Sequence, residues 1–212
     1  MAKTILFDLD GTLTDSGEGI INCAKYTFEQ FNVPIPSPEE LRTIVGPPLV
    51  DSFIRFGIAP QDADRAVEVY RSRYIPVGMY ENAPYPGIET LLHQLKTQGH
   101  TLAIATCKPE QMAGEILTHF GLAKYFDYIC GASADPPRKT KEAVIARFLE
   151  QAAPQGEIVM VGDTHIDVLG AAFHNIPTIG VAWGYGTVES MAEAGAVAIA
   201  KDIQQLQELL NQ

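Results

Sequence analysis

The sequence predicts an α/β fold, in which helices cover both faces of a parallel β-sheet. Four short segments are continuously apolar, which is typical of strands buried on both faces of such a sheet. Segments with helical periodicity separate them, and this alternation indicates βαβ crossovers. The four segments are TILFDLD (4–10), HTLAIAT (100–106), EIVMVGD (157–163) and IPTIGVAW (176–183), and YFDYICG (125–131) is expected to add another strand.

Four segments around these strands carry helical patterns. In KEAVIARFLEQ (141–151), the residues Val144, Ile145, Phe148 and Leu149 form a single apolar stripe. The other three helices are expected in GIETLLHQLKTQG (87–99), which ends on a glycine stop signal, in DVLGAAFHN (167–175) and in DIQQLQELL (202–210).

Residues from about 17 to 82 break the alternation, because they carry helical patterns and no clear strand. Apolar residues at helical spacing between Ile20 and Phe31 predict a first helix. The tetrapeptide SPEE (37–40) is typical of a capping box at a helix start. Further helices are expected in VDSFIRFG (50–57) and DADRAVEVYRSRY (62–74). We therefore expect a helical domain at 17–81, inserted into a core domain formed by 1–16 and 82–212.

Composition and charge argue against several classes of protein. With 212 residues, of which 46% are hydrophobic, the chain can bury a sizeable core. A net charge of −11 and the lack of a long basic run argue against nucleic-acid binding, and no apolar run approaches the ~20 residues of a membrane span. Three scattered cysteines fit neither a zinc site nor a disulfide framework. We expect a cytoplasmic monomer or homodimer without a signal segment.

Unusual polar residues follow three of the apolar segments. Asp8 and Asp10 end the first, Thr106 to Lys108 end the second, and Asp163 and Asp167 end the third. The carboxyl ends of parallel strands meet at one edge of a sheet, so Asp8, Asp10 and Asp163 are expected to converge there. Like charges at that spacing repel one another, and a hard cation such as Mg²⁺ would compensate them.

A magnesium ion held by carboxylates commonly keeps positions open for water and a phosphate oxygen. One carboxylate can then attack phosphorus, and a second can protonate the leaving oxygen and later activate water. Lys108, Lys139 and Lys141 are candidates for the cation that completes the charge balance. Lys141 lies in the first turn of a predicted helix and shares the inward face of Val144. An inward lysine there needs an anionic partner, and Asp8, Asp167 or a phosphate would serve.

These motifs resemble those of the haloacid dehalogenase superfamily, in its phosphatase branch with a small helical cap. DLDGTLTDS, IAT ending at Thr106, TKEAVI and VGDTHID match its four motifs in order along essentially the whole chain. TIVGPPL, YRSRY, PYPGI and GVAWGYG further resemble phosphoglycolate phosphatase-like members. The resemblance implies a Rossmann-like core, a cap that closes over the site, and hydrolysis of a small phosphorylated metabolite.

The resemblance also implies a role for each site residue. Asp8 would be the nucleophile, Asp10 the general acid and base, and Lys141 the charge clamp. Asp8, the backbone carbonyl of Asp10 and Asp163 would hold Mg²⁺, with Asp167 behind them. Phosphate binding is expected from three consecutive residues, Thr106, Cys107 and Lys108.

Two features depart from the family pattern. Cys107 stands where relatives often carry Asn or Ser, and the third motif lacks the common GKP form, so the choice of Lys141 over Lys139 rests on helical spacing.

A 5′-nucleotidase, a pyrophosphatase and a sugar phosphomutase share this scaffold and remain alternative functions. A dehalogenase would need neither Asp10 nor a metal. A catalytically silent binding protein is a more remote alternative, which the complete acidic set disfavours.

Overall fold

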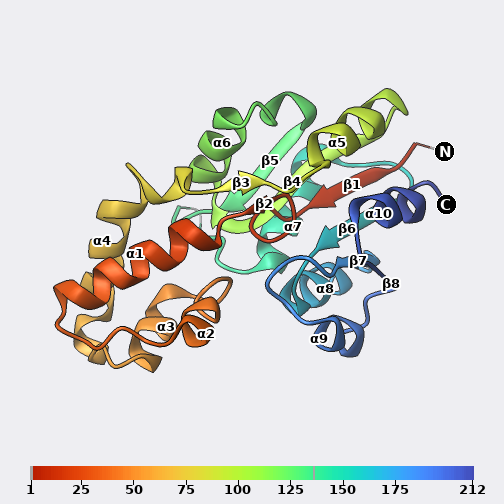
Figure 1. The fold of residues 1–212 in the computed structure, drawn as a ribbon. Helices are drawn as coiled ribbons and strands as arrows, with labels where there is room; N and C mark the ends of the chain where they lie inside the picture. Colours follow the sequence, from red (N-terminus) through yellow and green to blue (C-terminus); the bar gives the residue numbers. More distant parts are fainter. Residues whose placement is uncertain (1, 136) are drawn as a thin grey trace. The chain divides into compact units, whose positions relative to one another are not determined.

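The computed structural model describes residues 2–135 and 137–212 and divides the chain into two compact units. The core unit contains Met1–Asp15 and Pro84–Gln212, and the helical insert contains Ser16–Ala83. Two short strands, β2 (Thr14–Asp15) and β3 (Ala83–Pro84), pair where the chain leaves the core and returns to it (Figure 1).

A six-stranded parallel sheet forms the centre of the core unit, in the order β5-β4-β1-β6-β7-β8. The sequence prediction of an α/β fold with a parallel sheet is therefore confirmed. The strands are β1 (Thr4–Phe7), β4 (Thr101–Pro109), β5 (Tyr128–Ala132), β6 (Ile158–Gly162), β7 (Thr178–Val181) and β8 (Ala198–Ala200).

Strand β1 lies inside the sheet and pairs with β4 on one side and β6 on the other. All four of its residues are buried, which is why this segment is continuously apolar. The three strands that the polar motif residues follow are thus adjacent in the sheet, with β1 between β4 and β6. Their carboxyl ends meet at the middle of one sheet edge, and the residues that follow them share one place.

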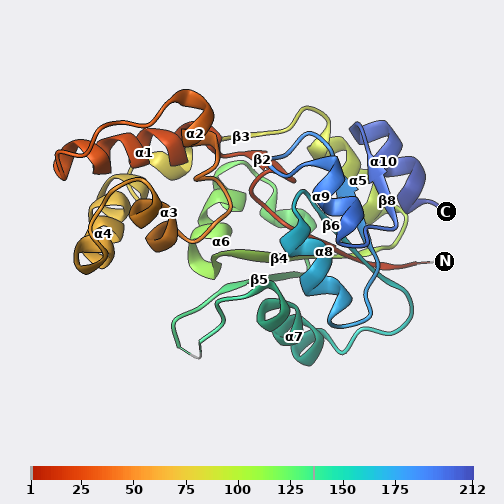
Figure 2. The same ribbon diagram turned by 90° about the horizontal axis from the view of Figure 1, so that it is seen from below.

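Helices cover both faces of the sheet. The connections from β1 to β5 run through α5 (Ile88–Thr97) and α6 (Glu110–His119), and those from β5 to β8 run through α7 (Lys141–Ala152), α8 (His165–Ala172) and α9 (Val188–Glu193). Figure 2 shows α6 on one side of β4 and β5 and α7 on the other. Helix α10 (Ile203–Leu210) packs beside α5. The first group of connections runs along the sheet in one direction and the second group in the other. Because such crossovers are right-handed, connections that run in opposite directions place their helices on opposite faces.

Several elements of the core were not predicted from the sequence, among them α6, α9, β8 and the short strand β2. Helix α6 has Gly114 in its interior, which weakens its helical pattern, and α9 has only six residues. Strand β8 has only three residues and lies at the sheet edge. Such short elements carry too few residues for a periodic pattern to stand out.

The helical insert contains α1 (Gly17–Gln30), α2 (Pro38–Arg42), α3 (Leu49–Arg55) and α4 (Ala63–Tyr74). The predicted capping box is present: Glu40 N–H donates to Ser37 Oγ at 3.3 Å, and Ser37 N–H donates to Glu40 Oε2 at 2.9 Å. Aromatic rings fill the interior of the insert, where Phe28 and Phe53 pack edge to face at 5.7 Å.

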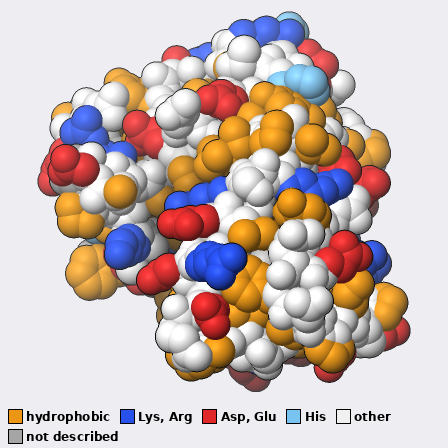
Figure 3. All heavy atoms as spheres, turned by 90° about the vertical axis from the view of Figure 1, so that its left-hand side faces the viewer, with side chains coloured by type: hydrophobic (Ala, Val, Ile, Leu, Met, Phe, Trp, Pro, Cys, Tyr) orange, Lys and Arg blue, Asp and Glu red, His pale blue; other side chains and the backbone are white. Residues whose placement is uncertain are grey.

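Acidic and basic side chains are interspersed with apolar ones on the face shown in Figure 3, so neither sign of charge forms a separate region there. Among the helices in the described part of the chain, none combines the length and the apolar character that crossing a bilayer requires.

Candidate active site

Asp8 follows directly after β1, at the edge where the three central strands end. Its N–H donates to the Val161 carbonyl of β6 at 2.9 Å, which fixes the backbone at this point. Its side chain is only 13% exposed. The carboxylate therefore has little water to solvate it, and it depends on groups from neighbouring strands and helices.

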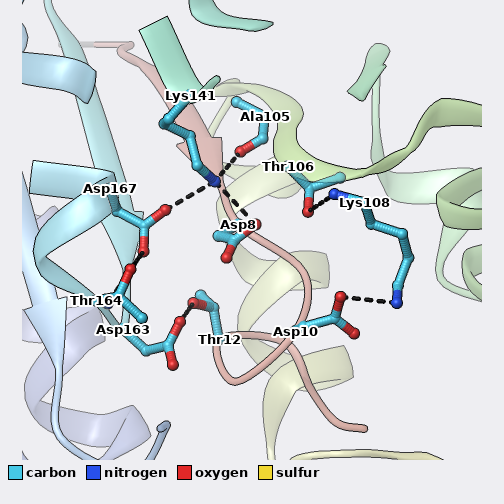
Figure 4. Close-up of polar contacts among 10 residues, drawn as sticks. All are labelled: Asp8, Asp10, Thr12, Ala105, Thr106, Lys108, Lys141, Asp163, Thr164 and Asp167. Atoms are coloured by element: carbon cyan, nitrogen blue, oxygen red, sulfur yellow. Dashed lines mark hydrogen bonds and ion pairs between the residues drawn. The ribbon is translucent and has the colours of Figure 1, made fainter. Parts of the chain in front are cut away.

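Lys141 is the first residue of α7, and its side chain is 2% exposed. The ammonium group lies 3.0 Å from Asp8 Oδ1 and 2.7 Å from Asp167 Oδ1, and it donates to the Ala105 carbonyl at 2.7 Å (Figure 4). The ammonium group thus has two carboxylate neighbours and one backbone carbonyl as acceptor. Both side-chain partners expected for an inward lysine, Asp8 and Asp167, are present.

Asp163 and Asp167 follow β6 and are almost completely buried. Asp163 accepts from Thr12 Oγ1 at 3.2 Å and from the Tyr185 N–H at 2.8 Å. Asp167 Oδ2 accepts from the N–H and the hydroxyl of Thr164, at 3.0 and 2.8 Å, in a capping box at the start of α8. Asp167 thus caps its helix with one oxygen and holds Lys141 with the other.

Three carboxylates come together at this edge of the sheet. Asp8, Asp163 and Asp167 each place an oxygen within 4.8 Å of the others. Two of the predicted metal ligands, Asp8 and Asp163, belong to this group together with Asp167, whereas the third predicted ligand is the backbone carbonyl of Asp10 and not a carboxylate oxygen. Three carboxylates and one lysine, if all are ionised, leave two negative charges uncompensated in the cluster.

Burial and mutual repulsion perturb the ionisation of this cluster. Burial raises the pKa of Asp8 to about 6, although Lys141 acts in the opposite direction. The pKa of Asp163 is also raised well above its ordinary value, mainly by burial and then by the charges of Asp167 and Asp8. Burial alone would lower the pKa of Lys141, but the attraction of Asp167 and Asp8 outweighs it and the pKa is raised. Lys141 therefore stays charged at neutral pH.

Asp10 lies two residues beyond Asp8, and its side chain takes a different partner. Asp10 Oδ2 forms an ion pair with Lys108 Nζ at 2.8 Å, and the lysine side chain is 7% exposed (Figure 4). The other oxygen, Oδ1, is buried and has no hydrogen-bond partner among the described residues. Lys108 thus holds one oxygen of Asp10, while the other has unused hydrogen-bonding capacity among the described residues.

The remaining candidate residues, Thr106, Cys107 and Lys139, differ in how far they are buried. Thr106 is buried at the end of the apolar part of β4, and its hydroxyl accepts from the Lys108 N–H at 3.2 Å and hydrogen-bonds Asp8. Cys107 is exposed as a residue, yet protein atoms surround its thiol, and this desolvation raises its pKa to about 11. Such a thiol is almost entirely protonated at neutral pH and is a poor nucleophile. Lys139 is exposed and forms no ion pair with any described residue.

The sequence reasoning did not assign the loop after β7 to the site, although this loop encloses Asp163. A Cβ atom on Gly184 would overlap the Asp163 side chain, so the backbone can approach it only because this residue is glycine. Gly11, with a φ of 81°, lies equally close to the Asp163 side chain. The WGYG tetrapeptide (183–186) was the available signal, since glycine is the residue that allows a close backbone approach.

Comparison with known proteins identifies the family. The family model described as haloacid dehalogenase-like hydrolase matches residues 5–181. A crystal structure of a predicted phosphatase from Clostridium acetobutylicum has a TM-score of 0.92 and 40% identity, covering 100% of this chain and 99% of that one.

Curated relatives carry several different names. The tyrosine-protein kinase PtkA of Mycobacterium tuberculosis is 40% identical over 98% of this chain and 72% of its own length. A 5′-nucleotidase of Pseudomonas aeruginosa is 36% identical over 97% of this chain and 94% of its own length. A phosphoglycolate phosphatase of Vibrio parahaemolyticus is 28% identical, over 98% of this chain and 96% of its own length. The chain belongs to the haloacid dehalogenase-like hydrolases and is a phosphatase of that family, as its four motifs predicted.

Proposed function

We propose that this phosphatase is a magnesium-dependent phosphomonoester hydrolase that acts on a small phosphorylated metabolite through an aspartyl-phosphate intermediate. The observation that carries the proposal is the buried group of Asp8, Asp163 and Asp167, whose oxygens lie within 4.8 Å of one another. Burying three carboxylates so close together is costly unless a cation shares the site. Lys141 supplies one positive charge and leaves a deficit of the size that a divalent ion would balance.

The donor set fits magnesium. All the candidate ligands are oxygens, and a hard cation prefers carboxylate, carbonyl and water oxygens. The raised pKa of Asp163 also favours a cation. This carboxylate accepts from the neutral donors Thr12 and Tyr185 and has no lysine or arginine partner among the described residues. We assign Asp8, Asp163 and the backbone carbonyl of Asp10 as the ligands. Asp167 is already engaged by Lys141 and Thr164, so we assign it to the surrounding shell. When bound, Mg²⁺ would neutralise the phosphate and polarise its oxygens.

Asp8 is the nucleophile in this proposal. It sits rigidly at the end of β1, and Lys141 and Thr106 fix its carboxylate. Attack of a carboxylate oxygen on phosphorus forms an aspartyl phosphate and releases the alcohol. Lys141 remains charged throughout, since its pKa is raised, and it stabilises the negative charge that surrounds the transferred phosphoryl group.

Asp10 is the general acid and base. Its Oδ2 is held by Lys108, and its Oδ1 lacks a partner among the described residues, which suits a group that must exchange a proton with a ligand. The protonated form of Asp10 donates to the leaving oxygen in the first step. The resulting carboxylate then removes a proton from the water that hydrolyses the phosphoenzyme. We assign Thr106 to phosphate binding and substrate selection to the helical insert, acting as a cap.

A 5′-nucleotidase activity is the second candidate. Its support is the comparison itself, because the 5′-nucleotidase relative is 36% identical and the phosphoglycolate phosphatase relative is 28% identical at similar coverage. Both activities would use the same core residues, and only the groups that recognise the leaving alcohol would differ.

A phosphate-release screen tests the proposal and separates the candidates. The substrates should be phosphoglycolate, nucleoside 5′-monophosphates, sugar phosphates, phosphotyrosine, pyrophosphate and an aryl phosphate, each with Mg²⁺ and with excess chelator. We expect hydrolysis of the aryl phosphate and of one metabolite class with Mg²⁺, and none in the chelator. Full turnover in the chelator would refute the metal requirement, and the preferred metabolite decides between the two candidates.

A further inference from the structure

Tyr185 contacts the site region through both its backbone and its side chain. Its backbone N–H donates to Asp163 Oδ2 at 2.8 Å, and its side-chain hydroxyl donates to Asp15 Oδ1 at 2.7 Å. Asp15 is the last residue of the core unit before the helical insert. One residue of the loop after β7 thus connects a carboxylate of the acidic group to the far end of the segment that begins at Asp10.

The segment from Asp10 to Asp15 is held by several contacts from the core unit. The Thr12 hydroxyl donates to Asp163 Oδ1 at 3.2 Å, and its carbonyl accepts from Trp183 Nε1 at 3.1 Å. The Tyr85 N–H donates to the Leu13 carbonyl at 3.0 Å. Asp10, at the start of this segment, therefore takes its place from these contacts as well as from its own ion pair with Lys108.

The aromatic side chains around this segment also contact one another. Tyr85 packs edge to face on Trp183, with ring centroids 6.3 Å apart. The Tyr85 side chain also hydrogen-bonds that of Tyr185. Because a phenol hydroxyl has one donor and two acceptor positions, Tyr185 can bind Asp15 and Tyr85 at the same time. The hydroxyl of Tyr185 is the shared atom of this network.

We propose that Tyr185 is a positioning residue for the hydrolytic reaction. Its hydroxyl anchors Asp15 while its N–H holds Asp163, so the segment that carries Asp10 keeps a fixed place relative to the acidic group. Displacement of an acid–base group by even a fraction of an ångström lowers the rate of proton transfer, whereas binding of the phosphate is less sensitive. This inference rests on the proposed function, because it assigns Asp10 and Asp163 their roles.

The Tyr185→Phe variant removes the hydroxyl and leaves the backbone N–H bond to Asp163 in place. We expect kcat for an aryl phosphate to fall on the order of three- to tenfold, the range for loss of one partly exposed hydrogen bond. KM and the melting temperature should stay close to those of the wild type. Tyr128→Phe is the matched control, since Tyr128 lies on β5 and its ring packs against Phe148. A Tyr185→Phe enzyme with the kcat of the control would overturn the proposal.

A double-mutant cycle tests whether the effect passes through Asp15. Asp15→Ala and Tyr185→Phe remove the same contact, so the double variant should lose no more activity than either single variant. Asp15→Asn keeps an acceptor oxygen and should retain more activity than Asp15→Ala. Losses that multiply in the double variant, or that simply follow a fall in melting temperature, would show that Tyr185 does not act through this contact.

A measurement without turnover separates this inference from the proposed function. Mg²⁺ alone should raise the melting temperature of the wild type, because ligands that bind the native state stabilise it. The Tyr185→Phe protein should require more Mg²⁺ for the same rise, while Tyr128→Phe should not. If the wild type hydrolyses no phosphate ester but this difference is seen, the proposed function fails, and what stands is that the Tyr185 hydroxyl holds the Asp10–Asp15 segment against the acidic group. If the wild type is active and the two variants are alike in both measurements, the positioning role fails.

Discussion

The edge of the core sheet and the interior of the helical insert are both buried, yet they are built from opposite kinds of side chain. At the sheet edge, Lys141, Asp163 and Asp167 are each at most 2% exposed, although all three are charged residues. Inside the insert, the buried side chains are mainly aromatic and aliphatic, and Phe28 and Phe53 are completely covered.

The difference between the two regions lies in what compensates burial. Apolar rings are stabilised by leaving water, so the insert gains free energy from its packed interior. Buried charges cost free energy unless each finds a partner, and replacing such groups by apolar residues commonly stabilises a protein. The core maintains a costly arrangement that packing alone does not require, which is the signature of a functional site. Variants in the two regions should therefore fail in different ways.

The largest effect is expected from Asp8→Asn, at the centre of the charged region. The amide cannot attack phosphorus, so neither the phosphoenzyme nor the product should form, and activity should fall by about 10⁴-fold or more. Rapid quench with labelled substrate should find no label on the protein. The melting temperature should not fall, because the variant removes one of the mutually repelling carboxylates. Substantial residual turnover would mean that another group is the nucleophile.

Asp10→Ala should slow the reaction by about 10²–10⁴-fold in the steady state, since general acid–base help is lost. With an aryl phosphate, whose leaving group needs little protonation, we expect a burst of phenol release up to one per active site. Slow turnover follows, because water still needs a base. An alkyl phosphate should give no burst. Turnover near the wild-type rate would contradict the role of Asp10 and reopen the dehalogenase-like alternative.

Lys141→Ala should lower turnover by about 10²–10³-fold, because it removes a fixed positive charge from the site. Lys139→Ala is the matched control: this lysine is two residues away, exposed, and without an ion pair among the described residues. Its activity should stay near that of the wild type. Equal losses in the two variants, measured with the same aryl phosphate, would reverse the assignment of the clamp.

Phe53→Ala probes the apolar region and should affect stability rather than chemistry. Removing this completely buried ring should lower the free energy of unfolding by about 3–5 kcal/mol, measured by urea denaturation. Phe173→Ala, at a position 74% exposed, should change it by less than about 0.5 kcal/mol. The folded fraction of Phe53→Ala should still hydrolyse an aryl phosphate. Loss of that activity in folded protein would show that the insert takes part in the chemistry.

The smallest effect concerns pH and the metal-free protein. Because the pKa of Asp8 is raised from its ordinary value of 3.8 to about 6, folding favours its protonated form. The free energy of unfolding should therefore fall as pH rises from about 4 to 6, by up to about 3 kcal/mol from Asp8. Asp163 contributes in the same direction. Denaturation in chelator across this pH range should show a shallower slope for Asp8→Asn, and an unchanged slope would exclude Asp8 as the cause.

The sequence by itself determined the fold class and most of the candidate site. A continuously apolar segment such as β1 predicts burial on both faces of a sheet, and helical spacing predicts which way Lys141 points. Both predictions are possible because each pattern repeats along the chain. The motif spacing placed Asp8 and Asp163 after separate strands, and the general geometry of parallel sheets then brought them to one edge.

Only the tertiary structure decided which partner each polar group takes. Nothing local to Asp10 indicates that it pairs with Lys108. The sequence offered Asp8, Asp167 or a phosphate as partners of Lys141, but it did not decide that both carboxylates take that place together. The same holds for Tyr185, whose two partners belong to segments that are remote along the chain. Such pairings depend on strand order and loop packing, which follow from the burial of the whole core. Short elements such as β8 form for the same reason, since neighbouring strands rather than their own pattern specify them.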